Sequence, residues 1–202
     1  MRNTLYTIGY SGFNITDFID ALKKYSINVI IDVRSTPFSS YFSAYNKEHL
    51  ERVLNSHHIY YRNYAKEFGA QQMERRFYTA QGYLDFELFT ASDVYHHGYQ
   101  KIEDGLKQEY VFAFMCAEKD PIDCHRSIMI SKPFNDNGYS VLHLLPAQNP
   151  VSQIDIEERL LDKYFPDRNQ LSLLSEQSDE NELITQAYRK RNAEIGYHLE
   201  EV

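Results

Sequence analysis

Two runs of apolar residues constrain the fold of this chain more than any other feature. Residues 27–33 (INVIIDV) and residues 110–115 (YVFAFM) carry mostly apolar side chains at successive positions rather than at alternating ones. A strand that is solvated on one face alternates apolar and polar residues, whereas a strand covered on both faces does not. We therefore expect two central strands of a parallel sheet with helices on both of its faces.

Helical and strand patterns alternate along the first three quarters of the chain. Asn14 and Asn46 are suitable N-caps, and each precedes apolar residues at helical spacing. Further strands are predicted at residues 5–9, 59–62 and 140–145, and further helices at 92–108 and from Pro121 to Asn137-Gly138. Residues 65–92 indicate loops and short helices. This alternation predicts an α/β fold with an open, mainly parallel sheet.

The C-terminal quarter has a different composition. Residues 150–202 carry 12 acidic and 6 basic residues, a net charge of −6, whereas residues 1–149 carry 17 and 15, a net charge of −2. We predict an α/β domain over residues 1–150 and an acidic helical C-terminal appendage over residues 151–202. Within the appendage, helices are expected at 153–164 and 183–195, joined by a linker at 172–182.

Cysteine content and hydropathy indicate the compartment. Cys116 and Cys124 are too few for the disulfide framework of a secreted scaffold, so both are expected as thiols in a reducing compartment. No apolar stretch has the length of a signal peptide or of a membrane span. We therefore predict a cytoplasmic protein without membrane contact, and no pattern in the chain indicates a cofactor.

Residues with polar, ionisable or thiol side chains come directly after several of the predicted strands. Ligands of open parallel sheets bind beyond the carboxyl ends of the strands, so residues after different strands converge there. The residues are Gly9-Tyr10-Ser11 after the first strand, Asp32, Arg34 and Ser35 after the second, and Cys116 to Glu118 followed by Cys124-His125-Arg126 after the strand at 110–115. This convergence predicts a ligand site at one edge of the sheet, with Ser35 among the candidate ligand-binding residues.

Cys124-His125-Arg126 carries the densest chemistry. A thiol at a helix N-terminus beside His and Arg is stabilised as a thiolate near neutral pH. The same helix end and Arg126 favour a phosphate or carboxylate group. Cys124 is therefore a candidate nucleophile, with His125 or Glu118 handling protons. In the alternative, Cys124 packs in the core while His125 and Arg126 satisfy neighbouring backbone and carboxylate groups.

Asp32 and Arg34 leave an apolar strand at the same predicted edge. In the functional interpretation, Asp32 is a base or an orienting group, and Arg34 binds anions together with Arg126. Alternatively, Asp32 and Arg34 form an internal ion pair that fixes the following loop. Tyr10 and Ser11 follow a glycine in a strand-to-helix turn whose backbone N–H groups are able to cradle an anion. An ordinary tight turn explains this pattern equally well.

The spacing does not indicate a metal ion. A metal site would need Cys116, Cys124 and His125 together with Asp32 or Glu118. Seven residues separate the two cysteines, which is not zinc-finger spacing, and the chain has no Cys-x-x-Cys or His-x-x-x-His pattern. Cys116, at the end of an apolar strand, is expected to be a buried core thiol.

Two other classes of function stay open. Residues 41–64 hold tyrosines interleaved with arginine and histidine, a pattern that serves base stacking in single-stranded nucleic acid but also half-buried packing. The missing basic excess disfavours such a nucleic-acid or nucleotide binder. In the third class, the acidic tail of an interaction module docks on a basic partner.

Three motifs, in this order, carry a resemblance to a known family. They are Thr7-Ile8-Gly9-Tyr10-Ser11, Ile31-Asp32-Val33-Arg34-Ser35-x-Pro37-x-Ser39 and Cys116-Ala117-Glu118-Lys119-Asp120-Pro121-x-x-Cys124-His125-Arg126. Over residues 1–145 the chain resembles the family called domain of unknown function 488. Where relatives tend to carry Leu-Gly-Gly-Arg, this chain has Phe68-Gly69-Ala70-Gln71 and so lacks that arginine.

The resemblance implies an α/β fold without an assigned reaction. The function that we expect is therefore the one indicated by the residues themselves. It is the binding or processing of a phosphate- or carboxylate-bearing small molecule or nucleotide at the Cys-His-Arg site.

Overall fold

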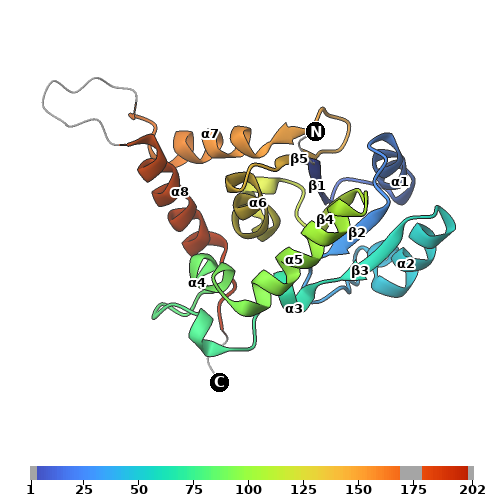
Figure 1. Cartoon of the computed structure of the whole chain (residues 1–202), viewed down its shortest axis with the longest axis horizontal. Coiled ribbons are helices and arrows are strands. Elements are labelled where there is room, and N and C mark those ends of the chain that lie inside the picture. Colours follow the sequence, from blue (N-terminus) through green and yellow to red (C-terminus); the bar gives the residue numbers. More distant parts are fainter. Residues whose placement is uncertain (1–3, 169–178, 200–202) are drawn as a thin grey trace, which may run out of the picture.

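The computed structural model describes residues 4–168 and 179–199, with a six-stranded sheet at its centre (Figure 1). The strands are β1 (Thr4–Gly9), β2 (Val29–Asp32), β3 (Tyr60–Asn63), β4 (Phe112–Cys116), β5 (Ser140–Leu144) and β6 (Val151–Ser152). Their order across the sheet is β3-β2-β4-β1-β5-β6. β1 to β5 run parallel, and β6 pairs antiparallel with β5. The predicted open, mainly parallel sheet is confirmed, and β6 is an addition to the predicted strands.

β2 and β4 are adjacent strands that are covered on both faces of the sheet. Phe112 and Phe114 of β4 belong to one core cluster, whereas Ala113 and Met115 belong to the cluster on the opposite face. β2 pairs with both β3 and β4 and is buried at every residue. Because neither face meets water, polar alternation is absent from these strands, which explains the two apolar runs in the sequence.

Helices cover both faces of the sheet, as the sequence predicts (Figure 1). The helices are α1 (Ile15–Lys24), α2 (Lys47–Ser56), α3 (Ala65–Phe68), α4 (Phe86–Thr90), α5 (Asp93–Lys107), α6 (Lys132–Asp136), α7 (Gln153–Tyr164) and α8 (Glu180–Ile195). α1 and α2 bury apolar residues against one face, and α3 to α8 contribute to the core on the other. None of the described helices is long and apolar enough to cross a membrane.

The two predicted N-caps behave differently. The Asn14 side chain accepts a hydrogen bond from the Asp17 amide at 2.9 Å and so caps α1, as predicted. Asn46 occupies the cap position of α2, but the described residues include no cap hydrogen bond from its side chain. Its Oδ1 instead accepts a hydrogen bond from the Ser39 amide at 2.6 Å. The Asn46 side chain, which the local sequence predicts to cap α2, therefore binds the loop after β2 instead.

Replacing Asn14 with alanine is expected to lower the free energy of unfolding by about 1 kcal/mol, because the first turn of α1 loses its side-chain acceptor. Urea denaturation measures this change. Asn14→Ser retains an acceptor and should stay within a few tenths of a kcal/mol of the wild type. Equal losses in both variants would show that the cap does not stabilise the helix.

Pro121 is not part of the helix that follows the Cys-His-Arg motif, so that prediction is wrong. Pro121 lies in a separate 3-10 turn, Pro121–Asp123. Cys124 then has an extended backbone, with φ of −133° and ψ of 137°. Its carbonyl accepts hydrogen bonds from the amides of Ser127 and Ile128. Cys124 therefore stands at the N-terminus of the helix, as predicted, although this helix begins later than expected.

The helix after Cys124 has two geometries. It is π-helical over Arg126–Ser131 and continues as α6. The Ser131 hydroxyl donates to the carbonyl of Arg126, five residues earlier, at 2.7 Å. π-helical segments of this kind are rare and often occur at functional sites. The helix ends before Asn137-Gly138, as predicted, and Gly138 has a φ of +84° that favours glycine.

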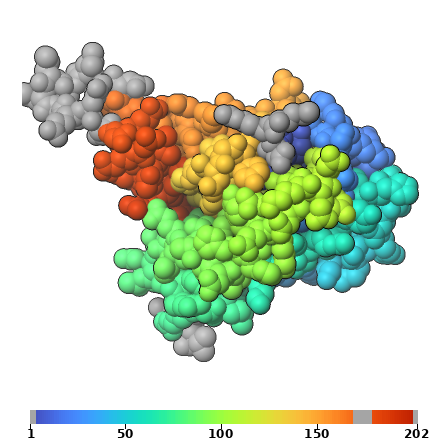
Figure 2. All heavy atoms as spheres, viewed as in Figure 1, coloured from blue at the N-terminus to red at the C-terminus, as the bar shows by residue number. Residues whose placement is uncertain are grey.

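The C-terminal helices pack on the same core as the strands. Ile156 and Leu160 of α7, and Ala187 and Tyr188 of α8, are buried in the core cluster that includes Phe114. In the space-filling view of Figure 2, α7 (orange) and α8 (red) lie against the yellow and green segments of the chain. This packing supplies the energetic reason why the acidic C-terminal quarter forms helices.

The helices predicted at 153–164 and 183–195 are confirmed, and α8 begins earlier, at Glu180. Of the predicted linker at 172–182, residues 172–178 lie outside the described residues. The division into a 1–150 domain and a 151–202 appendage stays a prediction.

Candidate functional site

The segments that follow β1, β2 and β4 are held together by backbone hydrogen bonds. The Tyr10 amide donates to the Cys116 carbonyl at 3.1 Å, and the Ser11 amide donates to the Ala117 carbonyl at 3.0 Å. The Val33 amide donates to the Met115 carbonyl of β4 at 3.1 Å. The residues after these strands therefore share one edge of the sheet. The Tyr10 and Ser11 amides are thus already paired within the protein, while ligand binding by Tyr10 and Ser11 stays a prediction.

Two thiols and one imidazole meet at this edge. The ligand atoms of Cys116, Cys124 and His125, here called the Cys-His cluster, all lie within 4.8 Å of one another. His125 Nδ1 is 3.9 Å from each of the two sulfurs. Cys124 is 1% exposed, and the other two side chains are also buried. Cys116 is buried as expected, and it also belongs to a cluster of polar groups.

Glu118 places a carboxylate next to the cluster. The Cys124 thiol donates a hydrogen bond to Glu118 Oε2 at 3.0 Å. Desolvation of the carboxyl and the nearby Cys124 raise the pKa of Glu118. Burial raises the pKa of Cys124, but the hydrogen bond from Cys116 and the charges of Arg126 and His125 outweigh it and lower that pKa. The sulfur and the carboxylate therefore compete for one proton.

The His125 ring is oriented by the backbone of the segment after β2. His125 Nε2 lies 3.2 Å from the Val33 carbonyl oxygen, which only accepts hydrogen bonds. Nε2 therefore carries a proton, and Nδ1 faces the two sulfurs. Burial lowers the pKa of His125, but the charge and hydrogen bond of Cys124 outweigh burial and raise it.

Arg126 points into the protein and supports the backbone of the site. Its side chain is fully buried. Nη1 donates to the Glu118 carbonyl at 2.7 Å, Nη2 to the Lys119 carbonyl at 3.2 Å and Nε to Thr7 Oγ1 at 3.3 Å. These contacts resemble the structural alternative considered for Arg126 and hold Glu118 in place beside Cys124.

Gly9 makes the approach of this backbone possible. A Cβ at Gly9 would lie 1.7 Å from the Glu118 carbonyl oxygen and 3.0 Å from Arg126 Nη2. No side chain fits at this distance from a backbone oxygen, so the close approach requires glycine. The glycine of the first sequence motif thus serves the packing of the third motif.

Asp32 and Arg34 form the internal ion pair that was considered as an alternative. Arg34 Nε donates to Asp32 Oδ1 at 2.9 Å, and Nη2 donates to Oδ2 at 2.6 Å. The Tyr61 hydroxyl also donates to Asp32 Oδ2, at 2.6 Å. Burial lowers the pKa of Arg34, but the hydrogen bonds and charge of Asp32 outweigh burial and raise it above its ordinary value. The guanidinium is therefore cationic.

One nitrogen of Arg34 is left over. Nη1 is buried and has no hydrogen-bond partner among the described residues, and Arg34 as a whole is 5% exposed. The guanidinium carbon lies 5.2 Å from the centre of the Tyr10 ring. Burial raises the pKa of Tyr10, the side-chain hydrogen bond and the charge of Arg34 lower it, and the charges of Cys116 and Glu118 raise it. The Tyr10 hydroxyl is therefore influenced by Arg34 and by groups next to the Cys-His cluster.

Ser35 connects the site to the segment that departs from the family pattern. Its hydroxyl oxygen accepts a hydrogen bond from the Gln71 amide at 2.9 Å. A Cβ at Gly69 would lie 2.9 Å from the same oxygen. Ser35 thus holds the loop at residues 69–71 in place, while its predicted contact with a ligand stays a prediction.

The aromatic residues between 41 and 64 do not form one surface. Tyr45 and Tyr61 are buried, and the Tyr45 ring stacks on Tyr10 with centroids 4.4 Å apart. Tyr41 is 92% exposed in the loop after β2, whereas Tyr60 lies at the amino end of β3. Base stacking by this segment stays a prediction. Its buried tyrosines are not accessible to a nucleic acid, whereas exposed ones such as Tyr41 are.

A buried polar chain, which the sequence analysis missed, continues from Arg126. Thr7 Oγ1 lies 2.7 Å from His143 Nδ1, and His143 Nε2 lies 2.8 Å from Gln153 Oε1. Gln153 in turn donates to the Tyr188 hydroxyl of α8 at 2.6 Å. A histidine inside the apolar strand at 140–145 was the one sequence signal for this chain.

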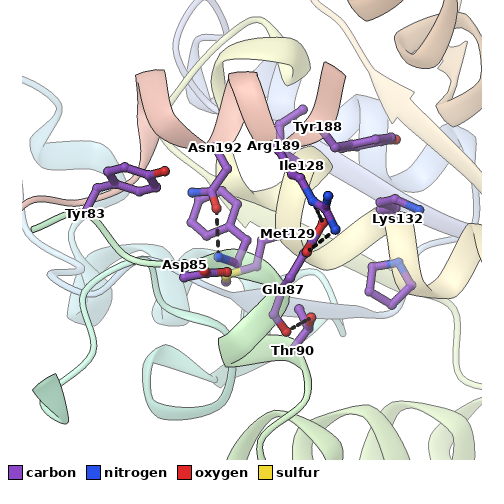
Figure 3. A pocket seen from close by; sticks show the side chains of 12 residues that line it. Tyr83, Asp85, Glu87, Thr90, Ile128, Met129, Lys132, Tyr188, Arg189 and Asn192 are labelled. Carbon is purple, nitrogen blue, oxygen red and sulfur yellow. Dashed lines mark hydrogen bonds and ion pairs between the residues drawn. The ribbon is translucent and has the colours of Figure 1, made fainter. Parts of the chain in front are cut away.

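A separate pocket lies between α4, the π-helical segment and α8 (Figure 3). Its volume is about 190 Å³, below the roughly 300–1,000 Å³ of most ligand pockets. Polar side chains in it already have partners, since Arg189 pairs with Glu87 and Asn192 accepts from the Phe86 amide. None of the described residues that line it belongs to the Cys-His cluster. We therefore place the candidate site at the sheet edge.

Comparison with known proteins agrees with the resemblance carried by the three motifs. Searches of curated proteins and of solved structures each return no match. The family model described as "Domain of unknown function DUF488" matches residues 14–132, which is more than half of the chain. The match includes Asp32, Arg34 and the whole segment from Cys116 to Arg126. The chain belongs to the DUF488 family.

Proposed function

We propose that this protein binds a small ligand bearing a carboxylate or phosphate at the carboxyl edge of the sheet, with Cys124 as the reactive group. The observation that supports the proposal most strongly is the Nη1 of Arg34, a buried cationic donor that no described residue pairs. Leaving a buried donor without a partner costs about 1–3 kcal/mol, and more for a charged group. An anionic oxygen at this place would remove that cost.

Arg34 is better placed to bind an anion than Arg126. Arg126 is fully buried and donates to three acceptors of the protein itself. Asp32 holds one edge of the Arg34 guanidinium and fixes its plane, while Nη1 keeps its donors. Planar guanidinium groups recognise carboxylates and phosphates through such oriented donors.

Glu118 is placed to take the proton of the Cys124 thiol. The proton moves from Cys124 Sγ to Glu118 Oε2, across 3.0 Å. The thiolate then bonds to an electrophilic carbon or phosphorus of the ligand while the bond from that atom to its leaving group breaks. The leaving group takes the proton from Glu118. Because this thiol must stay reduced, we also propose a reducing compartment such as the cytoplasm.

A pair of alkylating reagents tests the proposal. Iodoacetate and iodoacetamide both transfer a two-carbon group to sulfur and release iodide, but only iodoacetate carries a carboxylate. The ratio of their rates at Cys124 should be about tenfold or more higher in the wild type than in Arg34→Lys, because a hydrogen bond to a charged group contributes about 1.5–3 kcal/mol. Mass spectrometry of the Cys124 peptide, with EDTA present, gives both rates.

Arg34→Lys keeps a cation beside Asp32 but replaces the three guanidinium nitrogens, Nη1 among them, with one ammonium nitrogen. Thermal unfolding verifies that this variant folds. Inorganic phosphate should slow the reaction of the wild type with iodoacetate more than that with iodoacetamide. A folded Arg34→Lys protein with the wild-type rate ratio would contradict the proposal.

A further inference from the structure

We propose that the Cys-His cluster is a binding site for one zinc ion, with Glu118 as the fourth ligand. The three ligand atoms of Cys116, Cys124 and His125 lie within 4.8 Å of one another in the interior. This inference goes beyond the proposed function, because it requires neither Arg34 nor an anionic ligand. It assigns a role to Cys116, which the proposed reaction does not use.

The distances within the cluster approach those of a tetrahedral zinc site. With zinc about 2.3 Å from sulfur and about 2.0 Å from nitrogen, the ligand atoms lie roughly 3.5–3.8 Å apart. His125 Nδ1 is 3.9 Å from the sulfur of Cys116 and 3.9 Å from that of Cys124. Small side-chain shifts therefore complete the geometry. Thiolate and imidazole ligands favour zinc over calcium or magnesium, which prefer oxygen.

The His125 ring has the orientation of a metal-binding imidazole. Histidine ligands of metal ions usually donate the N–H of the second ring nitrogen to a carboxylate or backbone carbonyl, which fixes the tautomer. Here Nε2 faces the Val33 carbonyl at 3.2 Å, so Nδ1 is directed at the two sulfurs. The backbone after β2 thus holds the ring ready to bind an ion.

Glu118 and Arg126 complete the set of ligands and charges. Glu118 Oε2 lies 3.0 Å from Cys124 Sγ on an exposed residue. Glu118 is not among the groups whose ligand atoms all lie within 4.8 Å, so its side chain has to turn toward the ion. Two thiolates, one carboxylate and Zn²⁺ together carry one negative charge. The buried guanidinium of Arg126, bound to the Glu118 carbonyl at 2.7 Å, supplies one positive charge. A buried ion needs such compensation.

The spacing of the cysteines conceals this site in the sequence. Cys116 ends β4 and Cys124 precedes the π-helical segment, so the turn between them brings together two residues that no zinc-finger spacing relates. His125 is adjacent to Cys124 in sequence, and both side chains reach the cluster because the backbone changes from extended at Cys124 to helical at His125.

Zinc titration of the reduced, full-length chain in competition with a chromophoric chelator tests the proposal. We expect one zinc ion per chain. Cys116→Ser should weaken binding by more than about a hundredfold, because the loss of an outer-shell partner alone costs 10–100-fold. His96→Gln/His97→Gln, which removes an exposed histidine pair of α5, should leave the affinity unchanged.

Two measurements on the wild type need no variant. Cobalt(II) should give the thiolate charge-transfer absorption of a tetrahedral site, and zinc should slow the alkylation of Cys116 and Cys124. Absence of zinc binding by the wild type, or binding that survives in folded Cys116→Ser, would overturn the proposal. If zinc binding fails while Cys124 prefers iodoacetate in EDTA, only the zinc proposal is wrong. The reverse result overturns only the anion proposal.

Discussion

Replacing Arg126 with methionine is expected to lower the free energy of unfolding by about 3–5 kcal/mol, because a fully buried group that makes three charge-assisted hydrogen bonds is lost. Methionine fills part of the space with apolar atoms but donates no hydrogen bond. The carbonyls of Glu118 and Lys119 then lose the guanidinium as their hydrogen-bond donor. Urea denaturation near neutral pH, followed by circular dichroism, measures the loss.

Arg126→Lys is the matched control for this prediction. Its ammonium keeps the charge but lacks the planar set of donors that reaches all three acceptors, so an intermediate loss is expected. Arg126→Lys should also disturb the backbone that carries Glu118 and therefore change the alkylation rate of Cys124. A loss below about 1 kcal/mol in Arg126→Met would show that these hydrogen bonds contribute little beyond those made with water.

Acidification from pH 6.5 to pH 4.5 is expected to destabilise the folded protein by about 2 kcal/mol through His143 alone. Burial and the charge of Arg126 lower the pKa of His143 in the folded state to about 3. The unfolded chain binds a proton at this residue near its ordinary pKa of 6.5. Between these values only the unfolded state is protonated, so this contribution to stability is lost as the pH falls from 6.5 toward 3.

His143→Gln isolates this contribution. Glutamine does not titrate, and its amide is able to donate a hydrogen bond toward Gln153 in place of the imidazole. Urea denaturation of both proteins at pH 6.5 and at pH 4.5 should show a loss in the wild type that exceeds the loss in His143→Gln by about 2 kcal/mol. Parallel losses in the two proteins would mean that His143 is protonated in the folded state as readily as in the unfolded one.

The elements that were predictable from the sequence depend on interactions over a few residues. The apolar runs at 27–33 and 110–115 predicted β2 and β4, and Asn14 predicted the start of α1, because strand burial and helix capping leave local patterns. β6 is two residues long, and its pairing with β5 depends on the return of a loop. Asn46 has the local features of a cap, but a hydrogen bond to the loop takes its side chain.

The residues of the candidate site were predictable, but their relations were not. Because parallel strands end at the same edge, the positions of Arg34, Glu118 and Cys124 after their strands already indicated a common site. Whether an arginine faces a ligand or the protein depends on contacts with segments distant in sequence. Arg126 meets the carbonyls of the segment after β4, and Arg34 meets Asp32 along one edge only.

By itself the sequence determined the α/β class, the central strands and the set of polar residues at their carboxyl ends. These features depend on hydrophobic periodicity and on the succession of strands and helices, both of which can be read from the sequence. Only the tertiary structure decided that Cys116 joins Cys124 and His125, that Arg126 turns inward and that Arg34 keeps a nitrogen which no described residue pairs. These outcomes depend on side-chain directions and on the approach of separate segments, which Gly9 permits.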